Sequence, residues 1–462
     1  MKQVLVYTCA YNAEKTLKRT IESILAQTYS DWIYYIVDNG ATDKTGAIIN
    51  EYAAKDPRII PLANKENCVW EPGNTLDVVI RREPKCDYFC SLDADDEYKP
   101  RFLETMLEFT EKNNLDIAAC GYDFINASSN ALFVVRCLRQ NICLDKRGFS
   151  EAFSELHQFM RTYWAKLFSI PTLLKMDMTR IPSVPYGWDT LFTTDAFRCA
   201  GRVGILAESL HRYYLSPKSE TYRWDSKRID ADCILDDMAR SFLIDKHGAV
   251  SPKNDWFLHC VYLSSLNDTL HVLFSADLPL NEKIANLRDI ITHEKTQKML
   301  RQDNLTLDEF DDRLRYPVLK WLLSQNDALS ADSAKEIANI VSAMYVELPP
   351  ALDYESLCFI FRHMPELVDS LMIQEDYPKA LDAYIAASQD MEIADEDVET
   401  YILLGVNLSA AAENADAYIY FKKVWMSYLV DCDRLEEAKK ELNEFAQILP
   451  EDEDFAELGK RI

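Results

Sequence analysis

The first 125 residues alternate between short apolar runs of strand-forming residues and segments whose apolar residues recur at helical spacing. The expected strands are residues 4–8, 32–37, 58–62, 87–92 and 116–122, and the expected helices are residues 14–27, 45–54, 74–81 and 100–112. Strands that alternate with helices form a mostly parallel sheet with helices on both faces. We therefore expect a Rossmann-like α/β fold, in which ligands bind where the strands end.

From about residue 230 the strand-like runs disappear and amphipathic helices follow one another. The clearest are residues 255–274, 281–300, 330–345, 378–388, 417–428 and 434–449. Some carry alanine and aromatic residues at steps that weakly resemble tetratricopeptide repeats, for example Ala417 and Phe421. An all-α domain of ordinary amphipathic helices is the alternative. The predicted domains are residues 1–228, which are α/β, and residues 229–462, which are all-α and acidic.

The negative charge of the chain is concentrated in its second half. Acidic residues outnumber basic ones by 76 to 50, so the formal net charge is −26. Residues 1–230 carry only −2 of this charge, and residues 231–462 carry −24. A negative field repels nucleic acid and anionic membrane, which disfavours a protein that binds phosphate irrespective of sequence. The acidic half is either a solvated face or a docking surface for a protein partner.

Hydropathy and cysteine usage indicate the compartment. No apolar run approaches the roughly 20 residues that cross a bilayer, and the N-terminal residues do not resemble a signal peptide. The 12 cysteines form no CxxC pair, and several, such as Cys90 and Cys120, stand in apolar runs. Reduced cysteines of this kind are typical of the cytosol. We expect a cytoplasmic protein without a transmembrane segment, with peripheral attachment to a membrane left open.

Acidic residues gather in three turns, at residues 38–43, 93–97 and 187–189. In the second turn Asp93, Asp95 and Asp96 follow an expected strand, so their carboxylates can converge on one cation. Mg²⁺ and Mn²⁺ prefer oxygen ligands and bind one or two carboxylates together with substrate phosphates. The alternative is a solvated acidic turn, or a cap for the helix expected near residue 100.

Five segments, in the same order, resemble the glycosyltransferases of family 2, which have the GT-A fold. They are VYTCAYNAEKTLKRTIESILAQTYSDWIYYIVDNGATDKT, LDADDEYKPRFLE with its DxD motif, TYWAKLF, GWDTLF and ESLHRYYLSPKSET. Together they span about residues 1–224. The resemblance implies a GT-A domain that transfers a sugar from a nucleotide-sugar donor.

The resemblance also implies roles for the residues that match the donor-binding positions of the family. Tyr11 and Asp38 would line the uracil pocket of a UDP-sugar, with Cys9 close by. Asn39 stands at the second acidic position of the family's turn and would lie in the same pocket. Asp93 would face the ribose or the donor sugar.

Further positions match the metal and catalytic residues of the family. Asp95 and Asp96 would lie at Mn²⁺ or Mg²⁺ and the diphosphate, with Asp96 as the more direct metal ligand. Asp189 would be the general base for an inverting reaction, because a hydroxyl nucleophile needs a base on its side. His211 stands where some relatives contact metal or phosphate, although a structural role is the alternative. Asn74 matches an asparagine near the donor phosphates.

The sequence therefore predicts a metal-dependent, inverting enzyme that uses a UDP-sugar and a glycan, lipid-linked or protein acceptor. The alternative is a catalytically retired transferase that acts as a scaffold through its helical half. Two departures from the family motivate it: Asn39 lacks the acidic charge, and no basic residue stands beside Asn74, although Lys65, Arg81 or Arg82 could substitute. Nucleotidyl transfer is disfavoured because residues 8–12 contain no glycine for a phosphate-binding loop.

Overall fold

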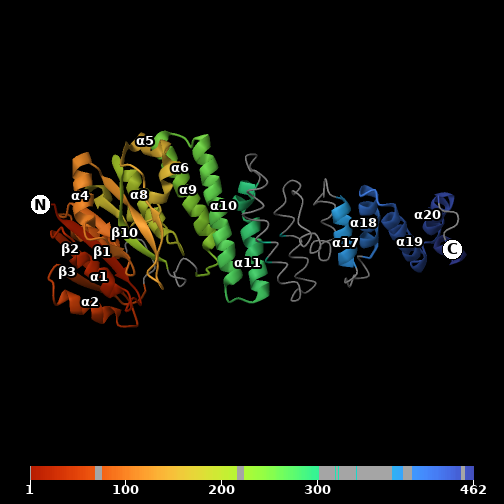
Figure 1. Cartoon of the computed structure of the whole chain (residues 1–462), viewed down its shortest axis with the longest axis horizontal. Coiled ribbons are helices and arrows are strands. Elements are labelled where there is room, and N and C mark those ends of the chain that lie inside the picture. Colours follow the sequence, from red (N-terminus) through yellow and green to blue (C-terminus); the bar gives the residue numbers. More distant parts are fainter. Residues whose placement is uncertain are drawn as a thin grey trace. The chain divides into compact units, whose positions relative to one another are not determined.

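The computed structural model describes residues 2–67, 75–215, 223–300, 377–388, 398–448 and 453–461, together with residues 318, 321 and 340. The chain forms two compact units, residues 1–272 and 273–462 (Figure 1).

The first unit is built on one ten-stranded sheet with the order β3-β2-β1-β4-β9-β6-β10-β5, in which β7 pairs with β6 and β8 with β10. Its strands are β1 Val4–Ala10, β2 Trp32–Asn39, β3 Ile59–Asn64, β4 Tyr88–Ser91, β5 Glu97–Tyr98, β6 Ile117–Asn126, β7 Leu132–Arg136, β8 Ile142–Asp145, β9 Lys166–Ser169 and β10 Arg202–Leu215. The pairs β1–β2, β2–β3, β1–β4 and β6–β10 are parallel, and β9 is antiparallel to both of its neighbours. The predicted α/β fold class is confirmed.

Helices follow the strands in the expected alternation. They are α1 Leu17–Leu25, α2 Thr45–Ala53, α3 Thr75–Arg82 and α4 Phe102–Asn113. Helix α2 packs on β2 and β3, whereas α4 packs on β6, β9 and β10. The central strand β1 is buried along its length, with Val4, Leu5 and Val6 each 0% exposed. This arrangement leaves the loops after β1, β2 and β4 at the same edge of the sheet, because parallel strands end on one side.

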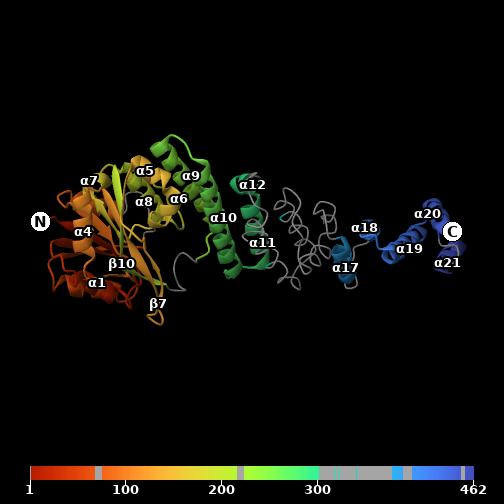
Figure 2. The ribbon, with the colours of Figure 1, turned by 45° about the horizontal axis from the view of Figure 1, so that its top comes forward.

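The first unit continues through several helices after β6. They are α5 Lys146–Glu151, α6 Phe153–Leu156, α7 Ile170–Leu173, α8 Trp188–Cys199, α9 Arg228–His247 and α10 Pro252–Ser275. Helix α9 packs against α8 and α5 (Figure 2), and Phe242 and Leu243 of α9 are buried in the same apolar core as the sheet. The sequence predicted a domain boundary after residue 228, whereas the compact unit includes α9 and most of α10.

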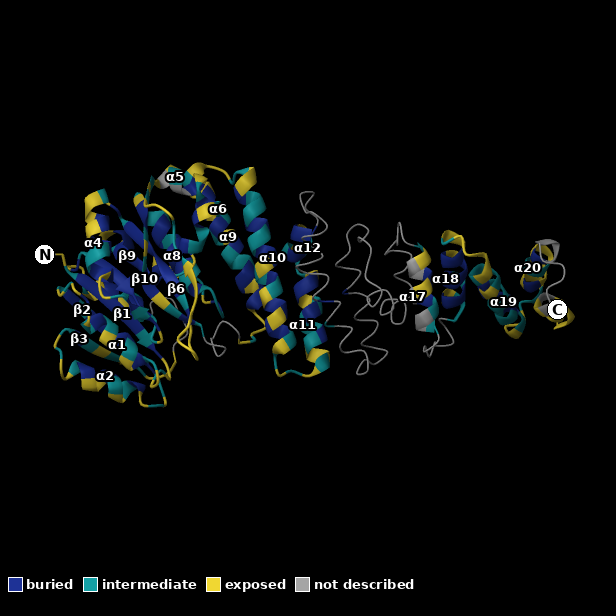
Figure 3. Ribbon diagram, in the orientation of Figure 1, coloured by how far each residue is buried: buried dark blue, intermediate teal, exposed yellow. Residues whose placement is uncertain are grey.

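The described residues of the second unit are helical. The helices are α11 Leu280–Thr292, α12 Glu294–Leu300, α17 Tyr377–Ser388, α18 Val398–Ala411, α19 Ala415–Asp431, α20 Leu435–Ile448 and α21 Glu453–Arg461. Buried residues alternate with exposed ones along them, as in amphipathic helices (Figure 3). The predicted helix at residues 330–345 lies outside the described residues apart from residue 340, and the repeat assignment stays a prediction.

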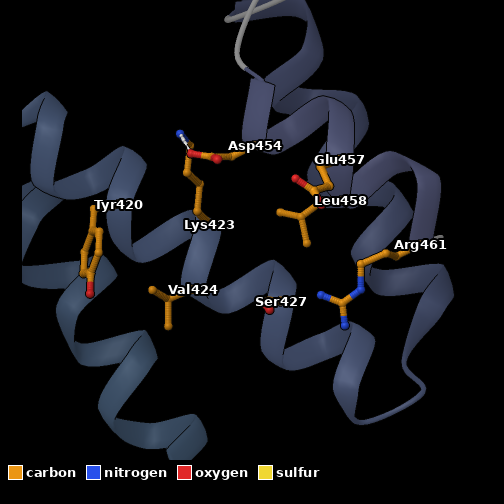
Figure 4. Close-up of a pocket in the computed structure, with 8 residues that line it drawn as sticks. All are labelled: Tyr420, Lys423, Val424, Ser427, Asp454, Glu457, Leu458 and Arg461. Atoms are coloured by element: carbon orange, nitrogen blue, oxygen red, sulfur yellow. Dashed lines mark hydrogen bonds and ion pairs between the residues drawn. The ribbon is translucent and has the colours of Figure 1, made fainter.

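An open pocket lies between α19 and α21 (Figure 4). An ion pair of 2.8 Å between Lys423 and Asp454 joins the two helices beside it. In the described part of the chain, no helix is long and apolar enough to cross a membrane.

Candidate active site

The acidic turn after β4 is held by contacts from α1. Thr20 Oγ1 donates to the carbonyl of Asp96 at 2.9 Å, and the Arg19 guanidinium donates to the carbonyl of Asp95. The next residues form β5, which pairs with β10. Glu97 on β5 accepts a hydrogen bond of 2.9 Å from the Tyr214 hydroxyl. The turn is therefore fixed from two elements that are distant in the sequence.

Asp96 is the buried member of the turn, at 0% exposure. The backbone N–H of Tyr214 donates to its Oδ1 at 2.9 Å, and His211 Nε2 lies 2.9 Å from its Oδ2. Burial raises the pKa of Asp96 well above its usual range, and the charge of Asp95 adds to this rise. Because both carboxylate oxygens already have partners inside the protein, the geometry disfavours our prediction that Asp96 is the more direct metal ligand.

His211 supports this buried carboxylate. Its ring stacks on Trp164 at a centroid distance of 4.6 Å and meets the edge of Tyr98 at 5.5 Å. Burial, together with the charge of Lys166, lowers the pKa of His211 to about 3, so the ring is neutral. Its Nδ1 is buried without a hydrogen-bond partner. The position of His211, 0% exposed, fits the structural alternative better than contact with a ligand.

The other two carboxylates of the turn are more accessible. Asp95 is exposed, and Asp93 is half-buried with its Oδ1 accepting a hydrogen bond of 3.2 Å from the Tyr163 hydroxyl. Burial raises the pKa of Asp93 well above its usual range, and the charges of Asp96, Asp95 and Asp189 raise it further. The fold therefore brings Asp189 close enough to Asp93 for the two carboxylates to repel each other.

Asp189 lies in the first turn of α8, next to Trp188, whose ring centroid is 6.5 Å from that of Tyr163. Burial raises the pKa of Asp189 to about 6, against the opposing charges of Arg161 and Lys166. The Lys166 side chain, 1% exposed, has a pKa lowered by burial to about 7. A carboxylate with a pKa of about 6 is mostly ionised at pH 7 and can still accept a proton.

The predicted nucleoside-binding residues follow β1 and β2. Tyr11 directly after β1 is 42% exposed, and Cys9 near the end of β1 is half-buried. Asp38 at the end of β2 is half-buried, and its Oδ1 accepts a hydrogen bond of 2.9 Å from the backbone N–H of Ala41. Its Oδ2 comes so near Gly46 that a Cβ at that position would lie 2.3 Å away. The exposed Tyr11 ring leaves a face on which a base can stack.

Asn39 belongs to a chain of amide side chains across the ends of β2 and β3. Its Nδ2 donates to Asn67 Oδ1 at 2.8 Å, and its Oδ1 accepts from Asn64 Nδ2 at 2.8 Å. Asn64 Oδ1 in turn accepts a hydrogen bond of 3.0 Å from Thr75. A carboxylate cannot donate, so this network explains why an amide replaces the acidic residue here. The contact of Asn39 with a donor stays a prediction.

The structure describes only some of the residues that we predict near the donor phosphates. Asn74 lies outside the described residues. Lys65 and Arg82 are exposed, and Arg81 forms an ion pair of 2.8 Å with Asp77 on its own helix.

Three site residues were not predicted from the sequence. They are Arg19, which lies 3.6 Å from the ring centroid of Tyr214, Tyr214 itself and Tyr163. Each acts across 70 or more residues of sequence on the acidic turn. No local pattern reports such pairings, because they depend on how α1, β10 and the segment before β9 pack around the acidic turn.

A mostly parallel sheet whose strand ends carry this acidic turn has the architecture of a GT-A glycosyltransferase. Residues 5–170 of the chain match the family model "Glycosyl transferase family 2". The uncharacterized glycosyltransferase EpsJ of Bacillus subtilis is 29% identical over 213 residues, 46% of this chain and 60% of that protein. MJ1057 of Methanocaldococcus jannaschii, also an uncharacterized glycosyltransferase, is 38% identical over 132 residues, 28% of this chain and 44% of that protein. The chain thus spans less than two thirds of these relatives.

Solved structures show a more distant similarity. Staphylococcus aureus TarS 1-349 in complex with UDP-GlcNAc is 15% identical with a TM-score of 0.41, and the match covers 86% of this chain and 95% of TarS. The mannosyltransferase PcManGT of Pyrobaculum calidifontis, in complex with GDP-Man and Mn²⁺, is 14% identical with a TM-score of 0.39. The match covers 64% of this chain and 82% of the PcManGT chain.

Proposed function

We propose that the protein is an inverting glycosyltransferase that transfers a sugar from a UDP-sugar to an acceptor hydroxyl. The observation that carries this proposal is the grouping of Asp93, Asp95 and Asp96 at the end of β4 with Asp189 at the start of α8. Inversion in one step needs a base on the acceptor side and charge stabilisation at the leaving diphosphate. Asp189 would supply the base, and the turn with Asp93, Asp95 and Asp96 would supply the charge stabilisation at the diphosphate.

A divalent cation fits the exposed side of the turn. Among the described residues, no three His, Cys, Asp or Glu side chains form a ready-made metal site. Mg²⁺ and Mn²⁺ commonly take only one or two carboxylates and complete their shell with substrate phosphates. Asp95, the exposed carboxylate, would hold the cation, with Asp93 beside it, and the cation would supply charge neutralisation to the diphosphate.

The remaining steps belong to the protein's own groups. Tyr11 and Asp38 bind and orient the nucleoside at the ends of β1 and β2. Tyr163 fixes the orientation of Asp93 through its hydroxyl. Asp189 accepts the proton of the acceptor hydroxyl as the sugar is transferred, because its raised pKa makes it a stronger base than an ordinary aspartate.

The test is a donor screen that measures release of UDP, GDP or TDP with Mn²⁺ or Mg²⁺. We expect UDP release that requires the cation and that Asp189→Asn lowers by about 10³-fold. Asp195→Asn is the matched control, because Asp195 lies two turns along the same helix and pairs with Arg198 at 3.4 Å. Equal activity of the two variants would refute the assignment of Asp189, and absence of nucleotide binding by calorimetry would favour the scaffold alternative.

A further inference from the structure

A buried polar cluster links α9 and α10 to the loop that precedes Asp189. Tyr186 in this loop donates a hydrogen bond to Asp232 Oδ1 on α9, and Thr269 on α10 donates to Asp232 Oδ2 at 2.9 Å. The Arg228 guanidinium lies 4.1 Å from the centroid of the Tyr186 ring. Arg228 and Asp232 are each 2% exposed, and Thr269 is 0% exposed. Tyr186 is therefore held directly by α9, and Thr269 of α10 holds the Asp232 carboxyl to which Tyr186 is bonded.

The backbone next to Tyr186 continues this connection to the helix that carries Asp189. Gly187 adopts a φ of +78°, and a Cβ there would lie 2.8 Å from Leu235 of α9. The Gly187 carbonyl accepts hydrogen bonds from the N–H groups of Thr190 and Leu191, at 3.1 and 3.2 Å. Gly187, which precedes the first turn of α8, thus packs closely against Leu235 of α9.

An apolar contact would join these helices at lower cost than a buried carboxyl. Removing a polar group from water costs free energy unless it finds hydrogen-bond partners. Both oxygens of Asp232 have a partner, and each partner comes from a different element. Burial raises the pKa of Asp232 to about 8, and the hydrogen bond from Thr269 opposes this rise. Directional bonds of this kind fix an orientation, which apolar packing does not.

We propose that Tyr186, Asp232 and Thr269 are positioning residues, which hold the first turn of α8 so that Asp189 faces the acceptor. The proposal rests on the proposed function only for the role of Asp189 as base. The bonds themselves lie between described residues of the first unit. It adds residues of α9 and α10 to the support of α8, and all three helices lie beyond residue 170, where the family-2 match ends.

Two substitutions that keep side-chain shape test the proposal. Tyr186→Phe removes the hydroxyl and keeps the ring under Arg228, and Thr269→Val removes the second hydrogen bond to Asp232. The matched control is Tyr35→Phe, because the Tyr35 hydroxyl also donates to a carboxylate, Glu83, at 2.6 Å, and the residue is 5% exposed. Tyr35 lies on β2, away from α8.

The first readout does not depend on activity. We expect the amide protons of Thr190 and Leu191 to exchange roughly threefold to tenfold faster in Tyr186→Phe and Thr269→Val than in Tyr35→Phe, the range that loss of one hydrogen bond predicts. The second readout is kinetic: kcat should fall by about the same factor while the KM for the donor stays unchanged. The thermal stability of all three variants is measured alongside both readouts.

The outcomes separate the two proposals. If Thr190 and Leu191 exchange at the same rate in all three variants, the positioning role is refuted, whatever the activity. If the two test variants lose thermal stability but keep the exchange rates and kcat of the control, the cluster only joins helices and the inference is also wrong. If the wild-type protein turns over no donor, the proposed function fails, and faster exchange at Thr190 would still support the positioning role.

Discussion

The pH dependence of transfer gives the sharpest test of Asp189. Burial raises its pKa to about 6, so roughly nine tenths of the carboxylate is ionised at pH 7 and roughly one tenth at pH 5. A general base works only when ionised, and kcat/KM should therefore fall about tenfold from pH 7 to pH 5. An aspartate with its ordinary pKa would remain mostly ionised at pH 5, and the rate would hardly change.

A second perturbation tests whether the surrounding charges tune this pKa. Lys166→Met removes a buried positive charge that favours the ionised form of Asp189. The pKa of Asp189 should rise, and the acid limb of the profile should move to higher pH by up to about one pH unit. Lys175→Met removes the same charge from an exposed loop position and should leave the profile in place.

The assay is initial-rate UDP release at low donor concentration from pH 4.5 to 8, with circular dichroism to show that the protein stays folded. Residual activity of Asp189→Asn should lose the limb near pH 6. A wild-type midpoint below pH 5 would contradict the reasoning, as would a Lys166→Met profile that matches Lys175→Met. A limb that persists in Asp189→Asn would assign the titration to another group.

Three further predictions concern the supports of the site. Asp95→Asn should weaken Mn²⁺ binding to the donor complex, measured by calorimetry, whereas Asp96→Asn should chiefly lower thermal stability, because Asp96 is buried and already hydrogen-bonded. His211→Phe should lower the free energy of unfolding by about 1–3 kcal/mol, measured in denaturant, because Asp96 Oδ2 loses its partner in a buried site. Gly187→Ala should lower stability by about 1–2 kcal/mol through its left-handed backbone. Adding Leu235→Ala to the Gly187→Ala variant should recover only the part of that loss that comes from the clash between the new Cβ and Leu235.

Five of the ten strands, β1, β2, β3, β4 and β6, could be predicted from the sequence, because they are short apolar runs that alternate with amphipathic helices. Residues 32–37 and 45–54 illustrate this, since β2 and α2 occupy nearly the same ranges. The other five strands, β5, β7, β8, β9 and β10, were not predicted. β7 exposes Leu132–Val135 on both of its faces and shows no alternation, so no period distinguishes it from a loop. The predicted helix over residues 281–300 is two helices, because His293 leaves the helical conformation with a ψ of 134°.

The carboxylates of the site could be predicted from the sequence, but the different surroundings of each carboxylate could not. Adjacent residues such as Asp95 and Asp96 look equivalent in a row of acidic letters. The register of β10 decides between them, because it places His211 and the Tyr214 N–H against Asp96 and leaves Asp95 exposed. The replacement at Asn39 likewise looked like a loss of function in the sequence, whereas the fold makes it part of an amide network.

The same electrostatics connects the acidic turn to the proposed chemistry. Asp93, Asp96 and Asp189 each have a raised pKa, with burial as the largest cause in every case. Crowded, desolvated carboxylates raise the free energy of the fully ionised site, and a divalent cation that arrives with a diphosphate relieves most of that repulsion at once. Under the proposed function, a cation held by Asp95 would favour the ionised form of Asp93.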